Sequence, residues 1–296
     1  LCLKAETVNL AMMAELPLVI VNVQRGGPST GLPTKTEQSD LLFALFGRNG
    51  DSPVPVIAAS TPADCFNMAL EASRIAVQFM TPVIYLTDGY LGNGTEPWMV
   101  PNLEDLPVFD FPHAQNSDDF QPYRRDPQTQ ARPWAIPGTP GLEHRIGGLE
   151  KQSVTGNVSY DALNHQKMTH ERASKVANIA NFIPEAELTG SSSDSLLVVS
   201  WGGTYGSVST AIDEVRKAGA PVAHVHLKYI NPFPRNFSDI VNQFEHIIVP
   251  ELNDGQLIQL LNAKYSKNAQ GYNKVQGKPF QVAELVEFFG RTLEGL

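Results

Sequence analysis

Cysteine is scarce in this chain, and its scarcity excludes two classes of protein. Cys2 and Cys65 are the only cysteines among 296 residues, and no C-x-x-C pair is present. Two thiols cannot build the disulfide framework of a small secreted domain, nor supply the four thiolate ligands of an iron–sulfur cluster. We therefore expect no such cluster in this chain, and a reducing cytoplasm is the simplest compartment for it.

Positive net charge and long apolar runs are missing as well. The formal net charge is −9 at pH 7, whereas a protein that binds nucleic acid needs a basic face. No stretch approaches the roughly 18 uninterrupted apolar residues of a membrane span, and no signal peptide is visible. The sequence therefore predicts a cytoplasmic protein with no nucleic-acid partner and no membrane span.

The chain also lacks a start methionine. It begins at Leu1, and residues 4–15 already have the composition of a helix in progress. We therefore expect that further residues precede Leu1 in the complete protein.

The sequence does contain an alternation of helices and apolar strands, which is typical of a doubly wound α/β protein. In the first part of the chain, we expect helices at residues 5–14, 36–46 and 60–80 and strands at residues 18–23, 54–58 and 82–86. In the last part, we expect strands at residues 195–201, 221–227, 246–250 and 274–276 and helices ending at residue 218 and spanning residues 237–243, 254–261 and 282–293. The pattern predicts two α/β domains.

The segment between these two parts has a different composition. Prolines recur throughout residues 94–156, so we expect little regular structure there. Aromatic residues such as Trp98 and Trp134 would anchor this segment on a domain or on a partner subunit. A helix at residues 166–181 then bridges to the second domain.

The most informative stretch is residues 18–35, LVIVNVQRGGPSTGLPTK, in which an apolar strand runs into a glycine-rich loop. Its continuous apolar run predicts a strand buried on both faces of a parallel sheet. Ligands in such sheets bind beyond the carboxyl ends of the strands. The loop residues that would face a ligand are Arg25, Gly26, Gly27, Ser29 and Thr30.

Arginine is well suited to this position because its planar fork of donors matches a carboxylate or a phosphate. The glycines lack Cβ atoms, so backbone amides can approach a ligand closely. We therefore hypothesise that Arg25 holds an acidic group of a substrate. The alternative is an ordinary surface turn with an exposed arginine.

Two glycine motifs come close to nucleotide-binding patterns without matching them. Residues 26–31 have the G-x-x-x-x-G spacing of a P-loop, but Leu32 follows where a lysine is required. Residues 202–206, GGTYG, follow a strand and open a helix, but lack the G-x-G-x-x-G register. The second motif is either a tight turn or a turn whose free amides suit an anion.

The histidines do not form a motif of metal ligands. His224 and His226 alternate along a strand and so point the same way, which favours packing or titration over metal binding in the absence of a third ligand. His144 and Arg145 lie in a glycine-flanked loop. His144 either forms a salt bridge in that loop or faces the active site.

Read together, several stretches resemble the α subunit of 2-oxoacid:ferredoxin oxidoreductases, most closely the 2-oxoglutarate branch. The stretches that carry the resemblance are residues 21–35, 81–91, 138–145 and 250–256. The resemblance covers nearly the whole chain, and the QRGGPSTG motif is its most specific element.

The resemblance implies a fold and a division into domains. Residues 1–108 would be the later part of a pyrimidine-binding domain of the thiamine-diphosphate type. Residues 109–190 would be a linker with a bridging helix, and residues 191–296 would resemble the transketolase C-terminal domain. The fold class is therefore α/β, with two doubly wound parallel-sheet domains joined by a long proline-rich connection.

The resemblance also implies a cofactor and partners. Thiamine diphosphate and Mg²⁺ would be held mostly by a β subunit, which would also carry, or pass electrons to, iron–sulfur clusters. Arg25, in the glycine-rich motif, would hold the carboxylate of the substrate. The cofactor-activating glutamate of the family lies upstream of Leu1, so this chain is not expected to hold thiamine diphosphate or to be active by itself.

The reaction implied is the oxidative decarboxylation of 2-oxoglutarate to succinyl-CoA, with coenzyme A as acyl acceptor and ferredoxin as electron acceptor. Such an enzyme is expected to be an oligomer. Two alternatives stay open: the same chemistry on pyruvate or a branched-chain 2-oxoacid, and a non-catalytic scaffold subunit whose proline-rich segment grips a partner.

Overall fold

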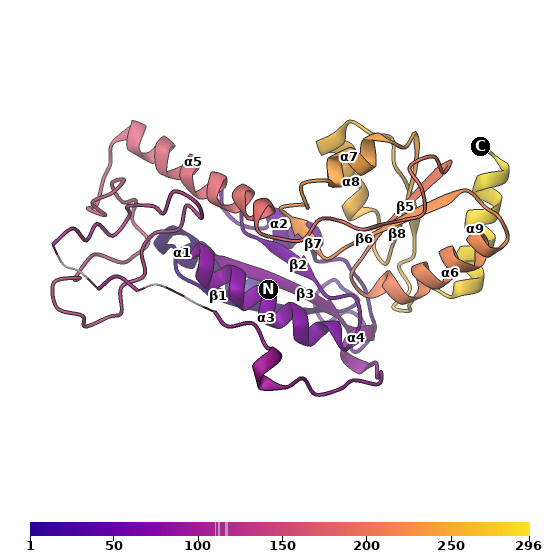
Figure 1. Cartoon of the computed structure of the whole chain (residues 1–296), viewed down its shortest axis with the longest axis horizontal. Helices are drawn as coiled ribbons and strands as arrows, with labels where there is room; N and C mark the ends of the chain where they lie inside the picture. The colour runs from indigo at the N-terminus through magenta and orange to yellow at the C-terminus, as the bar shows by residue number, and fades with distance from the viewer. Residues whose placement is uncertain (110, 112, 116–117) are drawn as a thin grey trace.

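The computed structural model describes the whole chain except residues 110, 112, 116 and 117. Figure 1 shows two lobes side by side, the first formed by the early part of the chain and the second by its last hundred residues. The α-helices are α1 (Ala5–Ala14), α2 (Leu41–Phe46), α3 (Asp64–Phe79), α4 (Gly89–Asn93), α5 (Ala162–Asn178), α6 (Tyr205–Lys217), α7 (Phe237–Asn242), α8 (Gln256–Tyr265) and α9 (Val282–Glu294). Short 3₁₀ helices occur at η1 (Cys2–Lys4), η2 (Leu103–Asp105), η3 (Ile179–Asn181) and η4 (Gly202–Thr204).

The first sheet has the strand order β1-β3-β2-β7. Its strands are β1 (Leu18–Gln24), β2 (Val56–Ala58), β3 (Pro82–Asp88) and β7 (Tyr229–Asn231). The first three are mutually parallel, as expected, and β7 joins β2 in the antiparallel sense. Because β7 lies beyond residue 191, the late part of the chain contributes the last strand of the first sheet. The boundaries proposed for the domains stay a prediction.

The second sheet has the strand order β4-β6-β5-β8-β9. Its strands are β4 (Leu188–Thr189), β5 (Leu196–Trp201), β6 (Val222–Leu227), β8 (His246–Glu251) and β9 (Gln270–Asn273). All neighbours are parallel except β4, which runs antiparallel to β6 at one edge. The predicted α/β class with two doubly wound sheets is confirmed, with one short antiparallel strand added to each sheet.

The prediction that the first strand is buried on both faces is wrong. Among the described residues, β1 pairs only with β3 and is therefore an edge strand. The side chains of Val21 and Val23 are 54% and 55% exposed. An apolar run in a sequence does not distinguish a central strand from an edge strand whose outer face lies uncovered.

The helix predicted at residues 36–46 begins only at Leu41. Thr36, Glu37 and Gln38 are buried but have no regular secondary structure, and their side chains bind other parts of the chain. Tertiary hydrogen bonds therefore replace the local helix over its first turn. The predicted last strand at residues 274–276 lies instead at β9, and β4, β7 and α4 were not predicted.

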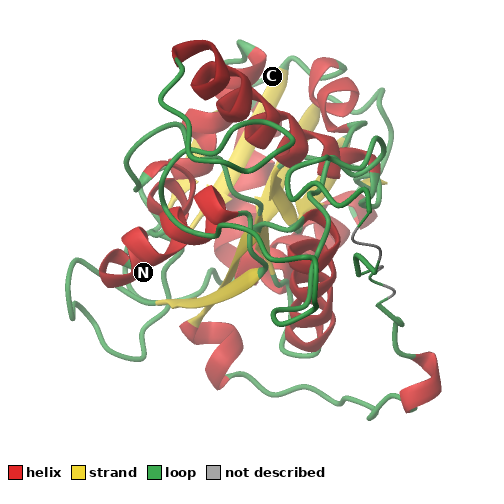
Figure 2. Ribbon diagram, turned by 90° about the vertical axis from the view of Figure 1, so that its left-hand side faces the viewer, coloured by secondary structure: helices red, strands yellow, loops and turns green. Residues whose placement is uncertain are grey.

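Apolar packing joins the two lobes into one body. One cluster of buried residues contains side chains from β2, β3, β5, β6 and β8 together with α7 and α8. Helix α3 covers the other face of the first sheet, while α6 and α9 cover the other face of the second. Figure 2 shows helices lying on both sides of the strands, with one strand at the lower left uncovered. No helix in the described part of the chain could cross a bilayer.

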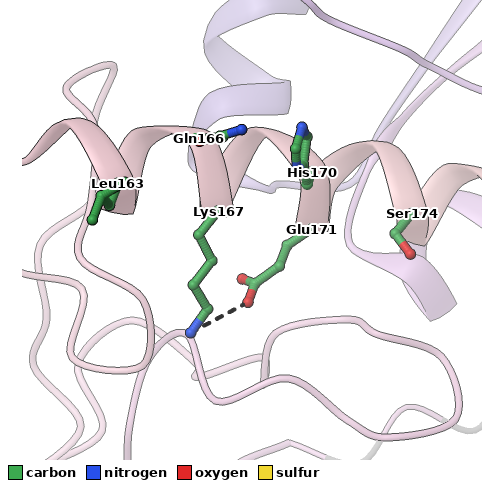
Figure 3. A pocket seen from close by; sticks show the side chains of 6 residues that line it. All are labelled: Leu163, Gln166, Lys167, His170, Glu171 and Ser174. Atoms are coloured by element: carbon green, nitrogen blue, oxygen red, sulfur yellow. Dashed lines mark ion pairs between the residues drawn. The ribbon is translucent and has the colours of Figure 1, made fainter.

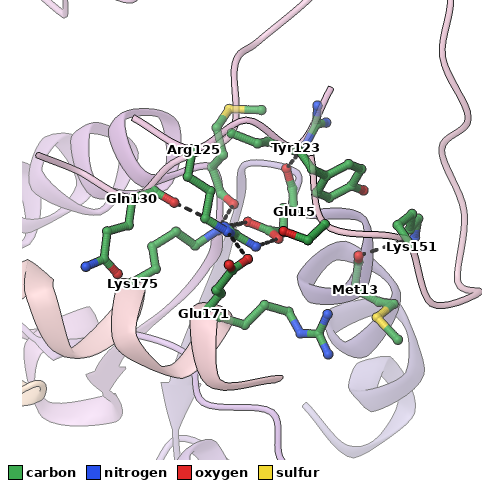
Figure 4. A network of polar contacts seen from close by, with 12 residues as sticks. Met13, Glu15, Tyr123, Arg125, Gln130, Lys151, Glu171 and Lys175 are labelled. Carbon is green, nitrogen blue, oxygen red and sulfur yellow. Dashed lines mark hydrogen bonds and ion pairs between the residues drawn. The ribbon is translucent and has the colours of Figure 1, made fainter. Parts of the chain in front are cut away.

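The proline-rich connection between α4 and α5 contains little regular structure among its described residues, as predicted. It is anchored on the first lobe by buried charges, shown in Figure 4. Arg125 donates to the carboxylate of Glu15, at the end of α1, and to Glu171 of α5 at 2.8 Å. Lys175 of α5 forms a further ion pair with Glu15. One buried carboxylate thus fixes the connection against two helices.

Candidate functional site

The loop that follows β1 is closed on itself by main-chain hydrogen bonds. The Gly26 amide donates to the Lys35 carbonyl at 2.9 Å, and the Leu32 amide donates to the Gly26 carbonyl at 2.8 Å. The Gly27 amide donates to Glu37 Oε2 at 3.3 Å. The amides of the two adjacent glycines therefore have internal partners and are not free to bind a ligand.

The predicted substrate-binding residues lie together on this loop. Arg25, Gly27, Ser29 and Thr30 are exposed, while Gly26 is buried. Within the described part of the chain, the Arg25 guanidinium has no hydrogen bond or ion pair, so its donors are free for a ligand from outside. Their role in binding stays a prediction.

The closed loop requires a glycine at position 31, because neither the backbone conformation nor the surrounding space there accommodates a side chain. The φ of Gly31 is +49°, and an added Cβ would lie 1.9 Å from the Gly26 carbonyl oxygen. We expect Gly31→Ala to lower the free energy of unfolding by about 1–3 kcal/mol and to raise hydrogen exchange at the Leu32 amide. Gly27→Ala is the matched control, because a Cβ there meets nothing within 4 Å. Equal stability of the two variants in thermal denaturation would contradict this expectation.

Behind the loop lies a buried carboxylate that sequence reasoning missed. Asp88, at the carboxyl end of β3, accepts hydrogen bonds from Thr36 Oγ1 at 3.0 Å and from the amides of Tyr90 and Leu91 at 2.8 and 3.1 Å. Burial raises the pKa of Asp88, and these hydrogen bonds oppose that rise. Asp88 therefore caps α4 and ties the end of the loop to the sheet.

Asp88 also resolves the alternatives for the glycine turn after β5. The Gly203 amide donates a hydrogen bond to Asp88. A Cβ on Gly203 would lie only 2.2 Å from Asp88 Oδ2. The turn does suit an anion, but that anion is a carboxylate of the same chain, which would repel a nucleotide phosphate.

Gln38 fills the crevice between the carboxyl ends of β5 and β8. The chain leaves β5 toward β6 on one side and later returns to β8 on the other, so ligands of an open sheet are expected there. The Gln38 side chain donates to the Trp201 carbonyl at 2.7 Å and accepts from the Leu252 amide at 3.0 Å. A side chain of the first lobe therefore occupies the place where an open sheet of this kind usually binds its ligand.

The residues 250–256 that carried part of the family resemblance belong to this interlobe contact. Asn253 Nδ2 donates to the Gln38 carbonyl at 2.8 Å, and Gln256 Nε2 donates to the Ser39 carbonyl at 2.7 Å. Glu251 is fully buried, and its carboxylate accepts from the Leu257 amide at 2.9 and 3.0 Å. Their role in this structure is to position the segment behind the loop.

Residues 27–31 also have the G-x-S-x-G spacing of a nucleophile elbow. Such an elbow places a serine between a strand and a helix, next to a histidine base. Ser29 has no histidine partner among the described residues, and the next α-helix, α2, begins only at Leu41. The spacing therefore gives no hydrolase site.

His224 and His226 lie on the same face of β6, as predicted. Ser200 Oγ lies between them, 2.7 Å from His224 Nε2 and 2.8 Å from His226 Nδ1. Burial lowers the pKa of His224 to about 4, so both rings pack as neutral groups under α6 at pH 7. The described residues offer no group of three His, Cys, Asp or Glu that could hold a metal ion.

His144 and Arg145 lie in the proline-rich connection. His144 Nδ1 is 2.8 Å from the Leu142 carbonyl oxygen, and its ring packs 5.4 Å from that of Phe120. No ion pair to His144 is found in the part of the chain that the structure describes, and Arg145 is exposed. A role for either residue in an active-site loop stays a prediction.

An open hollow along α5, of about 440 Å³, offers no convergent chemistry. In Figure 3, Lys167 and Glu171 project to one side of the helix and pair at 3.7 Å, whereas His170 points to the other side. All of its lining residues come from one helix. The loop after β1 therefore stays the candidate site.

Comparisons with known proteins identify the family. Residues 1–161 match the family model described as pyruvate flavodoxin/ferredoxin oxidoreductase, thiamine diphosphate-binding, and residues 195–285 match pyruvate:ferredoxin oxidoreductase core domain II. The chain is 49% identical, over 99% of its length, to "2-oxoglutarate oxidoreductase subunit KorA" of Mycobacterium tuberculosis, covering 45% of that protein. It is 30% identical to "2-oxoacid:ferredoxin oxidoreductase 1, subunit alpha" of Aeropyrum pernix, over 96% of the chain and 46% of that protein.

A solved structure agrees with these relatives. The 2-oxoglutarate:ferredoxin oxidoreductase from Magnetococcus marinus, with 2-oxoglutarate, coenzyme A and succinyl-CoA bound, superposes with a TM-score of 0.93 at 32% identity. The match covers 99% of this chain and 51% of that one, so the chain spans about half the length of the relatives it matches. The chain belongs to the thiamine diphosphate-binding family of pyruvate flavodoxin/ferredoxin oxidoreductases.

Proposed function

We propose that this chain is part of the α subunit of a 2-oxoglutarate:ferredoxin oxidoreductase, which converts 2-oxoglutarate and coenzyme A to succinyl-CoA and CO₂ while reducing ferredoxin. The observation that carries the proposal is the 49% identity, over 99% of the chain, to a 2-oxoglutarate oxidoreductase subunit. The ligands of the Magnetococcus marinus enzyme, 2-oxoglutarate, coenzyme A and succinyl-CoA, fit the same reaction.

The contribution of this chain to that reaction is to hold the substrate. Arg25 follows the carboxyl end of β1, is exposed, and has no partner among the described residues. Its two-pronged donor set can bind one carboxylate of the substrate by paired hydrogen bonds. The exposed hydroxyls of Ser29 and Thr30 on the same loop would supply further donors. Thiamine diphosphate, when bound, supplies the carbanion chemistry of the decarboxylation.

The cofactor and its metal are assigned to the assembled enzyme. As the family resemblance implies, Mg²⁺ and the diphosphate would be bound mainly by a β subunit. Iron–sulfur clusters would likewise belong to partner subunits. Exposed apolar side chains support such an assembly: Val23 on the edge strand is 55% exposed, and Met99 and Leu103 in the proline-rich connection are 89% and 85% exposed.

Replacing Arg25 tests the proposed substrate contact. We expect Arg25→Ala to lower kcat/KM for 2-oxoglutarate by about 10- to 100-fold in the assembled enzyme, since a hydrogen bond to a charged group contributes about 1.5–3 kcal/mol. Arg291→Ala is the control, because Arg291 lies on the exposed side of α9 and pairs only with Glu287 among the described residues, at 3.5 Å. The readout is 2-oxoglutarate- and coenzyme-A-dependent dye reduction.

The outcomes separate the proposed function from its alternatives. If Arg25→Ala keeps undiminished turnover, Arg25 takes no part in the mechanism, but the proposed reaction of the complex still stands. If the wild-type complex prefers pyruvate or a branched-chain 2-oxoacid, the alternative substrates are favoured. The description of the matching family model itself names pyruvate. A partner complex that keeps its activity without this chain would leave only the scaffold role.

A further inference from the structure

We propose that a second cavity, between α2, α5 and α8, binds a small organic anion with an apolar body. The cavity has a volume of about 780 Å³, within the range of sites that hold small molecules. It lies at the opposite edge of the first sheet from Arg25. Pro53 on its wall precedes the start of β2, and Asn231 ends the antiparallel strand β7, whereas Arg25 follows the carboxyl end of β1.

The walls of this cavity are mainly apolar and come from both lobes. Phe46 of α2, 67% exposed, stands on one side, and Leu260 of α8 on another. Ile230 and Phe233, which follow β6 in the chain, are buried among the lining residues. Such walls favour a hydrocarbon or aromatic body over a fully hydrated solute.

Two cations line the same cavity without an acidic partner. Among the described residues, neither Lys264 nor Arg48 has a carboxylate within ion-pair distance. Lys264 Nζ lies instead 4.9 Å from the centre of the Phe233 ring. Burial removes water from both charged groups and so lowers the pKa of each.

Arg48 is held in place by neutral groups, which leaves its charge uncompensated. Its guanidinium donates hydrogen bonds to three main-chain carbonyls, those of Ala44, Leu45 and Ser52, at 2.7–3.0 Å. Its Nε is buried and has no hydrogen-bond partner. Two unpaired cations on one cavity, Arg48 held by neutral carbonyls and Lys264 exposed, favour an anionic ligand in a chain whose net charge is −9.

One acid lies among the lining residues and gives the proposal a test of opposite sign. Asp51 is exposed and has no ion pair with any described residue. If the ligand is an anion, Asp51 opposes its binding while Lys264 favours it. Removing the charge of Asp51 should therefore raise the affinity for the anion, and removing the charge of Lys264 should lower it. An apolar groove without charges would predict neither change.

The probe for this site is 8-anilinonaphthalene-1-sulfonate, an anion with an aromatic body, titrated by fluorescence and calorimetry against the full-length subunit. We expect saturable binding of one probe per chain. Lys264→Gln should weaken it by about tenfold, the effect of losing one charge-assisted contact, while Asp51→Asn should strengthen it by about twofold. Lys217→Gln is the matched control, because Lys217 is exposed on α6 and lines no part of this cavity.

Each outcome decides for or against the site once circular dichroism and thermal melting have shown that the variants are folded. Opposite changes in Lys264→Gln and Asp51→Asn, with Lys217→Gln equal to the wild type, support it. The absence of saturable binding, an equal effect of Lys264→Gln and Lys217→Gln, or weaker binding by Asp51→Asn overturns it. Because the probe is not a substrate, these results do not depend on the proposed reaction.

Discussion

Glu15→Gln is expected to lower the free energy of unfolding by about 3–5 kcal/mol, because it leaves buried cations without their counter-charge. Glu15 is 1% exposed and ends α1 with a left-handed φ of 50°. Its carboxylate pairs with Lys175, which is 2% exposed, and with Arg125 of the proline-rich connection. The variant should also free that connection, so limited proteolysis should cut it faster than in the wild type.

The same carboxylate gives stability a defined dependence on pH. Burial by itself would raise the pKa of Glu15, but the charges of Lys175 and Arg125 outweigh burial and lower it to about 2. Since the unfolded chain then binds the proton more readily, this contribution is present above about pH 4.5 and is lost as the pH falls through 2. We expect the wild type to lose about 3 kcal/mol from this source over that window, and Glu15→Gln to lack the loss.

Glu171→Gln is the matched control for this prediction. Glu171 also accepts a hydrogen bond from Arg125, at 2.8 Å, but its side chain is 26% exposed. Water can replace the contact there, so we expect a cost of about 1 kcal/mol or less. Urea denaturation of the two variants side by side measures the difference. Equal midpoints and equal slopes would show that Glu15 is not the centre of the network.

Gln38→Leu is expected to cost about 1–3 kcal/mol for each of the two main-chain groups that it leaves without a partner. Gln38 is fully buried between the lobes. Leucine has a similar volume but cannot bond the Trp201 carbonyl or the Leu252 amide, which lie 2.7 and 3.0 Å from the amide group of the glutamine. The two lobes should then unfold less cooperatively.

Calorimetry and hydrogen exchange measure this effect. We expect a lower melting temperature, a broadened or split transition, and faster exchange of the Leu252 amide. Gln243→Leu is the control, because Gln243 is exposed at the end of α7 and should change stability by no more than about 0.5 kcal/mol. A single sharp transition at the wild-type temperature would show that the apolar core holds the lobes without Gln38.

The predicted effect of Gln38→Leu bears on the candidate site through position rather than chemistry. Gln38 fixes the segment after the glycine-rich loop, and in that segment Glu37 binds the Gly27 amide while Thr36 binds Asp88. Movement of that segment would displace Arg25 relative to the end of β3. Small shifts of this kind lower catalytic rates when substrates must be held in a reactive geometry.

The sequence by itself determined the alternating helices and strands, the irregular proline-rich connection and the loop that carries Arg25. These features depend on local apolar periodicity, proline and glycine, which act over a few residues. The family resemblance was equally readable, because it rests on short ordered motifs such as residues 18–35.

Only the tertiary structure decided which groups these elements bury. It placed β1 at a sheet edge, replaced the first turn of a predicted helix by contacts of Gln38, and gave the glycine turn after β5 the carboxylate of Asp88. Sequence periodicity could not reveal these contacts, because each joins residues far apart in the chain whose partners no local pattern specifies. The lone acid Glu15 likewise acquires its role from cations more than a hundred residues away.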